Sequence, residues 1–386
     1  MLLVPMDDTQ TDHLKAYGIS YWVIENEIVM EWLLNYRGGS FLMPHLQTIE
    51  EEMVIRGVKY EILTDGQTNQ IYAEIGNPEI NMEVIQLEKA PKIAVYTPEG
   101  KQPWDDAVTL VLEYAEIPYE KIYDSAIVNG VLPTYDWLHL HHEDFTGQYG
   151  KFYAAFRSYP WYQQQVADAE RSAQSLGFEK VSQLKLAVAR NIKSFVVGGG
   201  FLFTMCSGTD SYDIALAADG VDICESMYDG DGADPGAQSK LDFNNTLAFK
   251  DFLLEKDPMK YEYSNIDGTY LHRKGEQLDN FTLFDFSAKW DVVPTMLGQT
   301  TDFRKETIKP DVLILGESKE FGTARYIHGE FGQGTWTFYG GHDPEDYQHR
   351  VGDPPTDLNL HPNSPGYRLI LNNILFPAAK KKKRKT

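Results

Sequence analysis

The sequence predicts an α/β protein in which a parallel sheet of flavodoxin-like winding follows a smaller N-terminal α/β unit. From Lys92 onward, apolar runs of strand length alternate with segments of helical periodicity. This alternation is typical of parallel strands joined by crossover helices that cover both faces of the sheet. The chain has 386 residues, which is enough for two cores, because single domains usually hold about one to two hundred residues.

Residues 1–90 are predicted to form the small unit, and Pro91 marks its boundary with the next. Short apolar runs and helical segments alternate here too. The expected elements are a strand at Leu2–Met6, a helix at His13–Ile24, an apolar segment at Val29–Leu34, a strand at Phe41–Met43, a helix at Thr48–Arg56, a strand at Tyr60–Leu63 and a helix or strand near Ile80–Leu87.

Residues 91–377 are predicted to form the main domain, with an insertion at about 225–310 where the alternation is lost. The helix Val181–Phe195 is the clearest element, because its apolar residues recur three and four positions apart. The other expected elements are strands at Ile93–Thr97, Tyr119–Tyr123, Tyr135–His141, Phe201–Met205, Asp311–Leu315 and Thr335–Tyr339, and helices at Asp105–Ala115 and Gly366–Leu375.

Charge and composition exclude several classes of function. The formal net charge of −22 repels phosphate over most of the surface, so general nucleic-acid binding is not expected. No apolar run reaches the roughly 18 residues of a membrane span, and the first residues read as a strand rather than a signal peptide. Two cysteines, Cys206 and Cys224, exclude a disulfide framework and a multi-cysteine zinc site.

The C-terminal residues 378–386 form a strongly basic tail, with six consecutive positive charges from Lys380 to Lys385. Such a run repels itself and is expected to be disordered. It is either a solvated tail or a segment that docks on an acidic partner in an assembly, on the protein's own acidic face, on anionic lipid or on RNA.

Cys206 occupies the most informative position of the chain, the turn between the strand Phe201–Met205 and the helix expected after it. This is where a nucleophile elbow lies in an α/β enzyme. A cysteine nucleophile needs a base and an orienting carboxylate, and His342 and Glu345 follow the strand Thr335–Tyr339. Cys206, His342 and Glu345 are therefore the candidate catalytic residues.

These passages, 181–213 and 332–342, resemble the class I glutamine amidotransferases and their trehalose-utilisation (ThuA-like) relatives over roughly Lys92 to Phe376. The resemblance implies the order Cys, His, Glu along the chain. It also extends to uncharacterised Bacteroidota proteins that carry the label asparagine synthetase B, and it favours an extracytoplasmic over a cytoplasmic location.

The chain departs from the glutaminase pattern at two positions. Thr204 stands where the elbow normally has its first glycine, and Asp343 separates His342 from Glu345 by one residue too many. A side chain crowds a turn that needs glycine's freedom, and the extra residue rotates Glu345 relative to His342. Both departures disfavour a working glutaminase.

The segment Ser207–Ser211 also resembles the pyrophosphate loop of PP-loop ATP pyrophosphatases, which include the synthetase half of asparagine synthetase B, but one glycine is missing. Backbone amides of such a loop must approach phosphate closely. The shortened loop changes which amides point inward, so a PP-loop activity is the least favoured alternative.

A histidine-rich strand end is predicted to face Cys206 across a cleft. His139 and His141 share one face by alternation, and His142 and Glu143 follow them. The predicted ligand cleft consists of His141, His142, Glu143, Gly199, Gly200, Ser207 and Asp343. A polar cleft lining is favoured over a metal centre here, and a solvated turn over a calcium loop at Asp229–Asp234.

The sequence thus predicts a ligand-binding or scaffold protein on a glutamine amidotransferase-like fold, without full glutaminase activity. The competing hypothesis is a cysteine-dependent hydrolase in which Cys206 attacks a carbonyl and His342 moves the proton. No cofactor and no metal are predicted. A small-molecule ligand in the cleft and a protein partner are the expected interactions.

Overall fold

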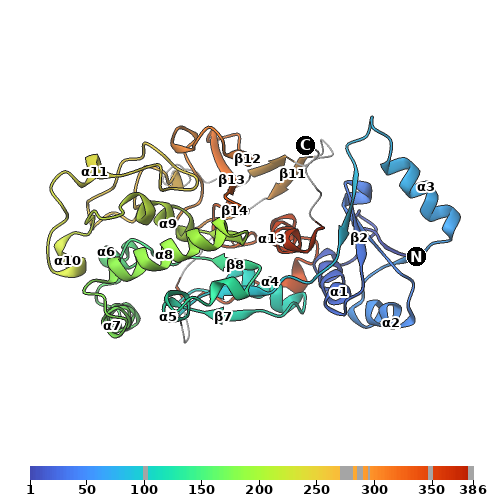
Figure 1. Cartoon of the computed structure of the whole chain (residues 1–386), viewed down its shortest axis with the longest axis horizontal. Coiled ribbons are helices and arrows are strands. Elements are labelled where there is room, and N and C mark those ends of the chain that lie inside the picture. Colours follow the sequence, from blue (N-terminus) through green and yellow to red (C-terminus); the bar gives the residue numbers. More distant parts are fainter. Residues whose placement is uncertain (99–102, 270–280, 285–289, 294–295, 347–350, 381–386) are drawn as a thin grey trace.

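The chain folds into a mixed α/β structure with two sheets, one in each predicted unit (Figure 1). The computed structural model describes residues 1–98, 103–269, 281–284, 290–293, 296–346 and 351–380. Residues 2–87 supply the strands of a smaller sheet, and residues 93–339 supply those of a larger one. The division into domains at about residue 90 stays a prediction.

The smaller sheet is antiparallel, with the strand order β4-β1-β3-β2-β5. Its strands and helices agree with the predicted elements to within a few residues, except that the helix α3 was not expected. Their bounds are β1 Leu2–Val4, α1 His13–Glu25, β2 Met30–Leu34, β3 Ser40–Met43, α2 Gln47–Arg56, β4 Glu61–Ile62, α3 Asp65–Ile75 and β5 Glu83–Leu87.

The larger sheet contains nine of the described strands, in the order β11-β10-β12-β13-β14-β9-β8-β6-β7. The five strands from β14 to β7 are parallel, and the strands from β11 to β14 pair antiparallel. Their bounds are β6 Ile93–Tyr96, β7 Glu120–Ile122, β8 Trp137–Leu140, β9 Phe201–Met205, β10 Phe281–Phe284, β11 Trp290–Val293, β12 Leu313–Ser318, β13 Thr323–Phe331 and β14 Gly334–Tyr339.

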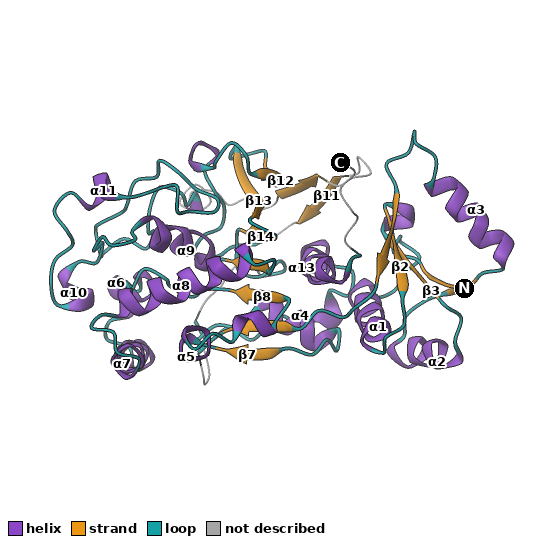
Figure 2. Cartoon of the chain, viewed as in Figure 1, coloured by secondary structure: helices purple, strands orange, loops and turns teal. Residues whose placement is uncertain are grey.

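Helices cover both faces of the parallel strands (Figure 2). On one face α4 and α13 pack together with α1 of the small unit, and on the other α8 packs with α5, α7 and α9. The α-helices in the described part of this unit are α4 Ala107–Tyr114, α5 Asp124–Val128, α6 Tyr153–Phe156, α7 Pro160–Ser175, α8 Val181–Val197, α9 Ser207–Ala217, α10 Ser226–Asp229, α11 Ala237–Lys240 and α13 Pro365–Leu375.

The inner parallel strands β6, β8, β9 and β14 are buried on both sides, as doubly covered strands must be. Phe203 and Met205 of β9 belong to the core beneath α4 and α13, whereas Leu202 belongs to the core beneath α8 and α9. The first of these cores also contains Tyr17 and Phe41 of the small unit. One continuous hydrophobic cluster therefore joins the two sheets.

The predicted insertion at about 225–310 contains long loops and short elements, including α10, α11, β10 and β11 (Figure 2). The two strands extend the larger sheet by antiparallel pairing. Part of the insertion, and the tail beyond Lys380, lie outside the described residues. Within the described part, none of the helices has the length and apolar character needed to cross a membrane.

Candidate functional site

Four neighbouring strand ends carry the candidate site, because the parallel strands β6, β8, β9 and β14 end at one edge of the larger sheet. Asp105 and Asp106 precede α4 after β6, and His141 and His142 directly follow β8. Cys206 directly follows β9, and His342 lies three residues beyond the end of β14. The carboxyl edge of an open α/β sheet is the edge at which ligands usually bind.

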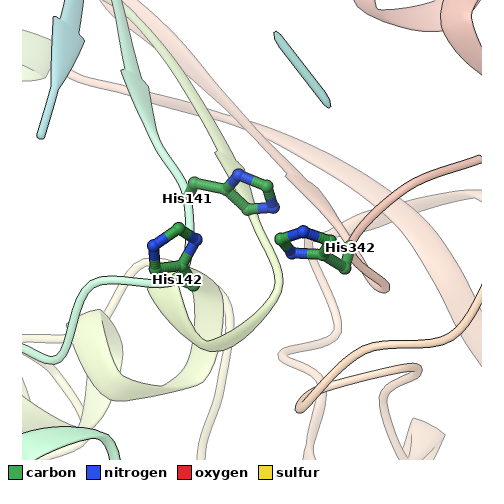
Figure 3. A group of neighbouring side chains, drawn as sticks. All are labelled: His141, His142 and His342. Atoms are coloured by element: carbon green, nitrogen blue, oxygen red, sulfur yellow. The ribbon is translucent and has the colours of Figure 1, made fainter. Parts of the chain in front are cut away.

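Three histidines from two strand ends converge at this edge (Figure 3). The rings of His141 and His342 stack with their centroids 4.2 Å apart, and the His142 ring lies 4.9 Å from His141 and 5.8 Å from His342. His141 and His342 are buried, and His142 is half-buried. The structure therefore brings together three of the predicted site residues.

Two aspartates, Asp105 and Asp106, contact the histidines of this edge. Asp106 Oδ2 is 3.3 Å from both His139 Nε2 and His141 Nδ1, and Asp105 Oδ1 is 3.6 Å from His342 Nε2. Asp106 also caps α4 by accepting the backbone N–H groups of Val108 and Thr109. This cap fixes the position of the carboxylate relative to the strand ends.

Burial and charge shift the pKa values of this group in opposite directions. Burial acts to raise the pKa of Asp106, but the adjacent His139 and His141 hold it well below its usual range. Burial, reinforced by the neighbouring carboxylate of Asp343, raises the pKa of Asp105 to about 6. Burial lowers the pKa of His139, against the attraction of Asp106.

Cys206 forms a strained turn between β9 and α9. Its backbone has φ 52° and ψ −140°, a conformation that a residue with a side chain rarely adopts. Its N–H donates to the carbonyl oxygen of Gly341 at 3.0 Å, which ties the turn to the chain segment that carries His342. The predicted placement of Cys206 at a strand-to-helix turn agrees with this geometry.

The thiol of Cys206 is sealed from solvent by the covering segment, residues 297–301. Cys206 is 0% exposed, and its Sγ accepts the backbone N–H of Gln299 at 3.3 Å. Burial raises the pKa of the thiol to about 11, although the N–H groups of Thr300 and Gln299 act against this. A thiol in this state is a poor nucleophile.

Hydrogen bonds hold the covering segment in place from several sides. Its Gln299 side chain donates to the carbonyl oxygens of Gly150 and Tyr261, at 2.7 and 3.1 Å. The Thr300 hydroxyl donates to Asp210 Oδ1 of α9 at 2.9 Å, and the Thr300 carbonyl accepts the N–H of Gly341 at 2.7 Å. The covering segment is thus anchored both to α9, the helix that follows the Cys206 turn (the elbow helix), and to the end of β14.

Gly208 allows α9 to pack directly against the end of β8. A Cβ atom on Gly208 would lie 2.1 Å from the carbonyl oxygen of His141, far inside van der Waals contact. The glycine is needed for this close approach, and it fixes the distance between the elbow helix and the backbone of His141.

The remaining acidic candidates do not join the histidine cluster in the contacts that the structure gives. Glu143 is buried, and its carboxylate accepts the Tyr123 hydroxyl at 3.3 Å; burial raises its pKa to about 7. Asp343 accepts the Tyr367 hydroxyl at 2.6 Å. Glu345 pairs with His361 at 3.2 Å, and Asp105 Oδ1 lies 3.6 Å from His342 Nε2.

Gly199 and Gly200 do not lie in the predicted cleft. They precede Phe201 at the amino end of β9, whereas Cys206 follows its carboxyl end. Five strand residues at about 3.3 Å each separate the two ends by roughly 16 Å. These glycines end α8 and begin the strand, and assigning them to the ligand cleft was wrong.

The Ser207–Ser211 segment is the first part of the helix α9. Ser207 is fully buried there, the Thr209 hydroxyl donates to the Cys206 carbonyl at 2.6 Å, and the Ser211 hydroxyl donates to the Glu143 carbonyl at 3.0 Å. These hydroxyls support the elbow and do not line an open phosphate loop.

The acidic turn at Asp229–Asp234 is compensated by lysines. Lys180 Nζ lies 3.0 Å from Asp229 and 2.5 Å from Asp231, and Lys240 Nζ lies 3.0 Å from Asp234. The expectation of a solvated turn in place of a calcium loop is consistent with this pairing.

Side chains of the described residues form three groups that could hold a metal ion. They are His141, His142 and His342; Asp106, His139 and His141; and Asp222, Cys224 and Asp229. Within each group the ligand atoms lie within 4.8 Å of one another. The first two groups share His141 and belong to the candidate site.

Sequence reasoning missed Asp105, Asp106 and the covering segment. Asp105-Asp106 was assigned only to the start of a helix, although an acidic pair just beyond a buried parallel strand is a signal for this edge. The covering segment gave no such signal, because it lies about 90 residues beyond Cys206 in the predicted insertion.

Comparisons with known proteins do not assign this chain to a family. No protein-family model and no curated protein matches the chain. Solved structures with some similarity include two cytoplasmic proteins of Salmonella typhimurium. STM3548 has 10% identity and a TM-score of 0.35, and STM1381 of strain LT2 has 12% and 0.36; each match covers 75% of this chain and 100% of the other.

A third similar structure is Gan42B, a GH42 beta-galactosidase, with 11% identity and a TM-score of 0.29 over 66% of this chain and 28% of that one. None of these similarities is strong enough to carry an argument about function.

Proposed function

We propose that this chain is a ligand-binding protein on a flavodoxin-like, glutamine amidotransferase-like fold, and that it binds its ligand through the histidine cluster without using Cys206 as a nucleophile. Numbered along the chain, the parallel strands have the order 2-1-3-4-5, which is the flavodoxin order. Ligands of such sheets bind where the strand order reverses. Here that point lies between β6 and β8, whose ends carry Asp105, Asp106, His141 and His142.

The observation that carries this proposal is the sealed thiol. Cys206 is fully buried beneath Gln299, with its pKa raised to about 11 by burial. At about pH 8, a pKa near 11 leaves roughly 0.1% thiolate, against about a quarter for an ordinary thiol. A nucleophile would need both the thiolate and a path for the substrate, and the covering segment blocks that path.

Thiol labelling tests the proposal. Cys224 is buried as well, so a Cys224→Ser variant isolates Cys206 for reaction with a chromogenic disulfide reagent. We expect the folded variant to react at least about 100-fold more slowly than the same variant in denaturant, from the thiolate fraction alone. Rapid stoichiometric labelling of the folded protein would contradict the proposal.

A cysteine-dependent hydrolase is the second candidate, and one observation favours it. The positive φ of Cys206 at a strand-to-helix turn is the backbone form of a nucleophile elbow. Glutamine and p-nitrophenyl acetate, offered to the wild type and to Cys206→Ser, separate the candidates. Turnover that disappears with the Cys206→Ser substitution supports the hydrolase; equal rates for the two proteins support the binding protein.

A further inference from the structure

We infer that His141, His142 and His342 bind a divalent transition-metal ion of the zinc type. This inference rests on the proposed function, because it assigns a ligand to the same strand-end site. Neutral imidazole nitrogens are preferred ligands of Zn²⁺, Ni²⁺ and Cu²⁺. Three protein ligands leave a fourth coordination position for water or a bound ligand. Catalytic zinc sites have this open arrangement, whereas structural zinc sites have four protein ligands.

The ligand atoms lie near one another, but the rings of His141 and His342 are stacked and must turn before both can donate to one ion. The ligand nitrogens lie within 4.8 Å of one another, and a tetrahedral ion with Zn–N distances of about 2.0–2.1 Å needs them about 3.3 Å apart. The ligand nitrogens therefore have to approach by up to about 1.5 Å. His142 is half-buried, and Figure 3 shows its ring beside the other two.

Asp106 prepares His141 for this role. Its Oδ2 lies 3.3 Å from His141 Nδ1, which leaves Nε2 as the coordinating atom. Both ring nitrogens of the buried His141 lack a hydrogen-bond partner among the described residues, and Nδ1 has the 3.3 Å ion-pair contact with Asp106. In metal-binding histidines the second ring nitrogen generally donates to a carboxylate or carbonyl, and Asp106 is placed to accept from Nδ1.

The surrounding charge also suits a cation. The Asp105 carboxylate lies 3.6 Å from His342, and the Asp106 carboxylate lies 3.3 Å from His141. A divalent ion held by neutral imidazoles carries its full charge into this buried position. The two carboxylates offset that charge without occupying the coordination positions.

The other separate group, Asp222, Cys224 and Asp229, already has a cation. Lys180 Nζ lies 2.5 Å from Asp222 and 3.0 Å from Asp229. Burial and the adjacent carboxylates keep the pKa of the Cys224 thiol well above its usual range, which disfavours the thiolate that a metal requires. This group provides the rival site that the experiment has to exclude.

Calorimetric titration of the metal-stripped full chain with ZnCl₂ at neutral pH tests the inference. We expect one Zn²⁺ per chain, with binding lost in His141→Ala, His142→Ala and His342→Ala. Asp106→Asn should keep the helix cap, because Asn caps as well as Asp, but weaken Zn²⁺ binding about 10- to 100-fold. His45→Ala, at an exposed histidine beside α2, and Cys224→Ser should bind as the wild type does.

Circular dichroism identifies variants that fail to fold; should the buried His141 and His342 variants do so, His142→Ala and Asp106→Asn remain decisive. A second measurement, the visible absorption of Co²⁺, should show a tetrahedral site in the wild type and not in His142→Ala. No Zn²⁺ in the wild type, Zn²⁺ retained in His142→Ala, or loss only in Cys224→Ser would each overturn the inference.

The proposed function fails by a different result. A reactive Cys206 or Cys206-dependent turnover would refute it whatever the metal does, whereas absent Zn²⁺ with an unreactive Cys206 would refute the metal site alone.

Discussion

Asp210 links the elbow helix to the covering segment, and its ionisation should weaken the fold. Asp210 is fully buried in α9 and accepts the hydroxyl of Thr300. Burial raises its pKa from 3.8 to about 7. Between these values the folded chain holds a proton that the unfolded chain has lost, so the free energy of unfolding falls as the pH rises and levels off above about pH 7.

The substitution Asp210→Asn removes this titration and keeps an acceptor for Thr300. From the two pKa values, wild-type stability should fall relative to Asp210→Asn by about 2 to 3 kcal/mol between about pH 5 and about pH 8. Urea unfolding at both pH values measures the difference. Asp251→Asn is the control, because the Asp251 side chain is 70% exposed. A gap between wild type and Asp210→Asn that stays the same at both pH values would refute the reasoning.

Two further substitutions test the packing around the site. Lys185 Nζ lies 3.1 Å from Asp124 Oδ1, and both side chains are buried. Lys185→Met should therefore lower the free energy of unfolding, measured in urea, by about 3–5 kcal/mol. The double variant Asp124→Leu/Lys185→Met should recover most of this loss of stability. Gly208→Ala places a methyl group 2.1 Å from the His141 carbonyl and should lower both the urea midpoint and Zn²⁺ affinity. Gly66→Ala, on α3, where a Cβ would meet only the Thr64 hydroxyl at 4.0 Å, should slightly stabilise the chain. A Gly208→Ala variant as stable as wild type would contradict the close contact.

Local pattern was enough to predict most elements of the parallel sheet. The strand Phe201–Met205 was predicted with its observed bounds, and the helix predicted at Val181–Phe195 runs two residues further, to Val197. The helix carries a strong periodicity and the strand is a continuous apolar run, as expected in a doubly covered sheet where apolar residues are required on each face. The helix α7 was missed because it buries only Tyr162 and Ala173, so its apolar stripe is weak.

The site was predicted in part, for reasons of chain geometry. Strand polarity brings residues after different parallel strands to one edge, and this is why His141, His142 and His342 could be expected near Cys206. Two features do not follow from strand order. The side-chain directions of Glu143 and Glu345 depend on local turns, and the sealing of Cys206 depends on Gln299, a residue of an irregular segment distant in sequence.

The strained backbone of Cys206 has a consequence that does not require a reactive thiol. A positive φ at a residue with a side chain costs about 1–3 kcal/mol and persists only where the surroundings enforce it. Here the Cys206 N–H holds the Gly341 carbonyl at 3.0 Å, one residue before His342. Two residues after Cys206, Gly208 lies against the His141 carbonyl. The turn thus contacts the backbone at both strand ends that bear the histidines, so it sets the spacing between His141 and His342. The turn at Cys206 therefore helps to hold the histidine cluster together whether or not its thiol reacts.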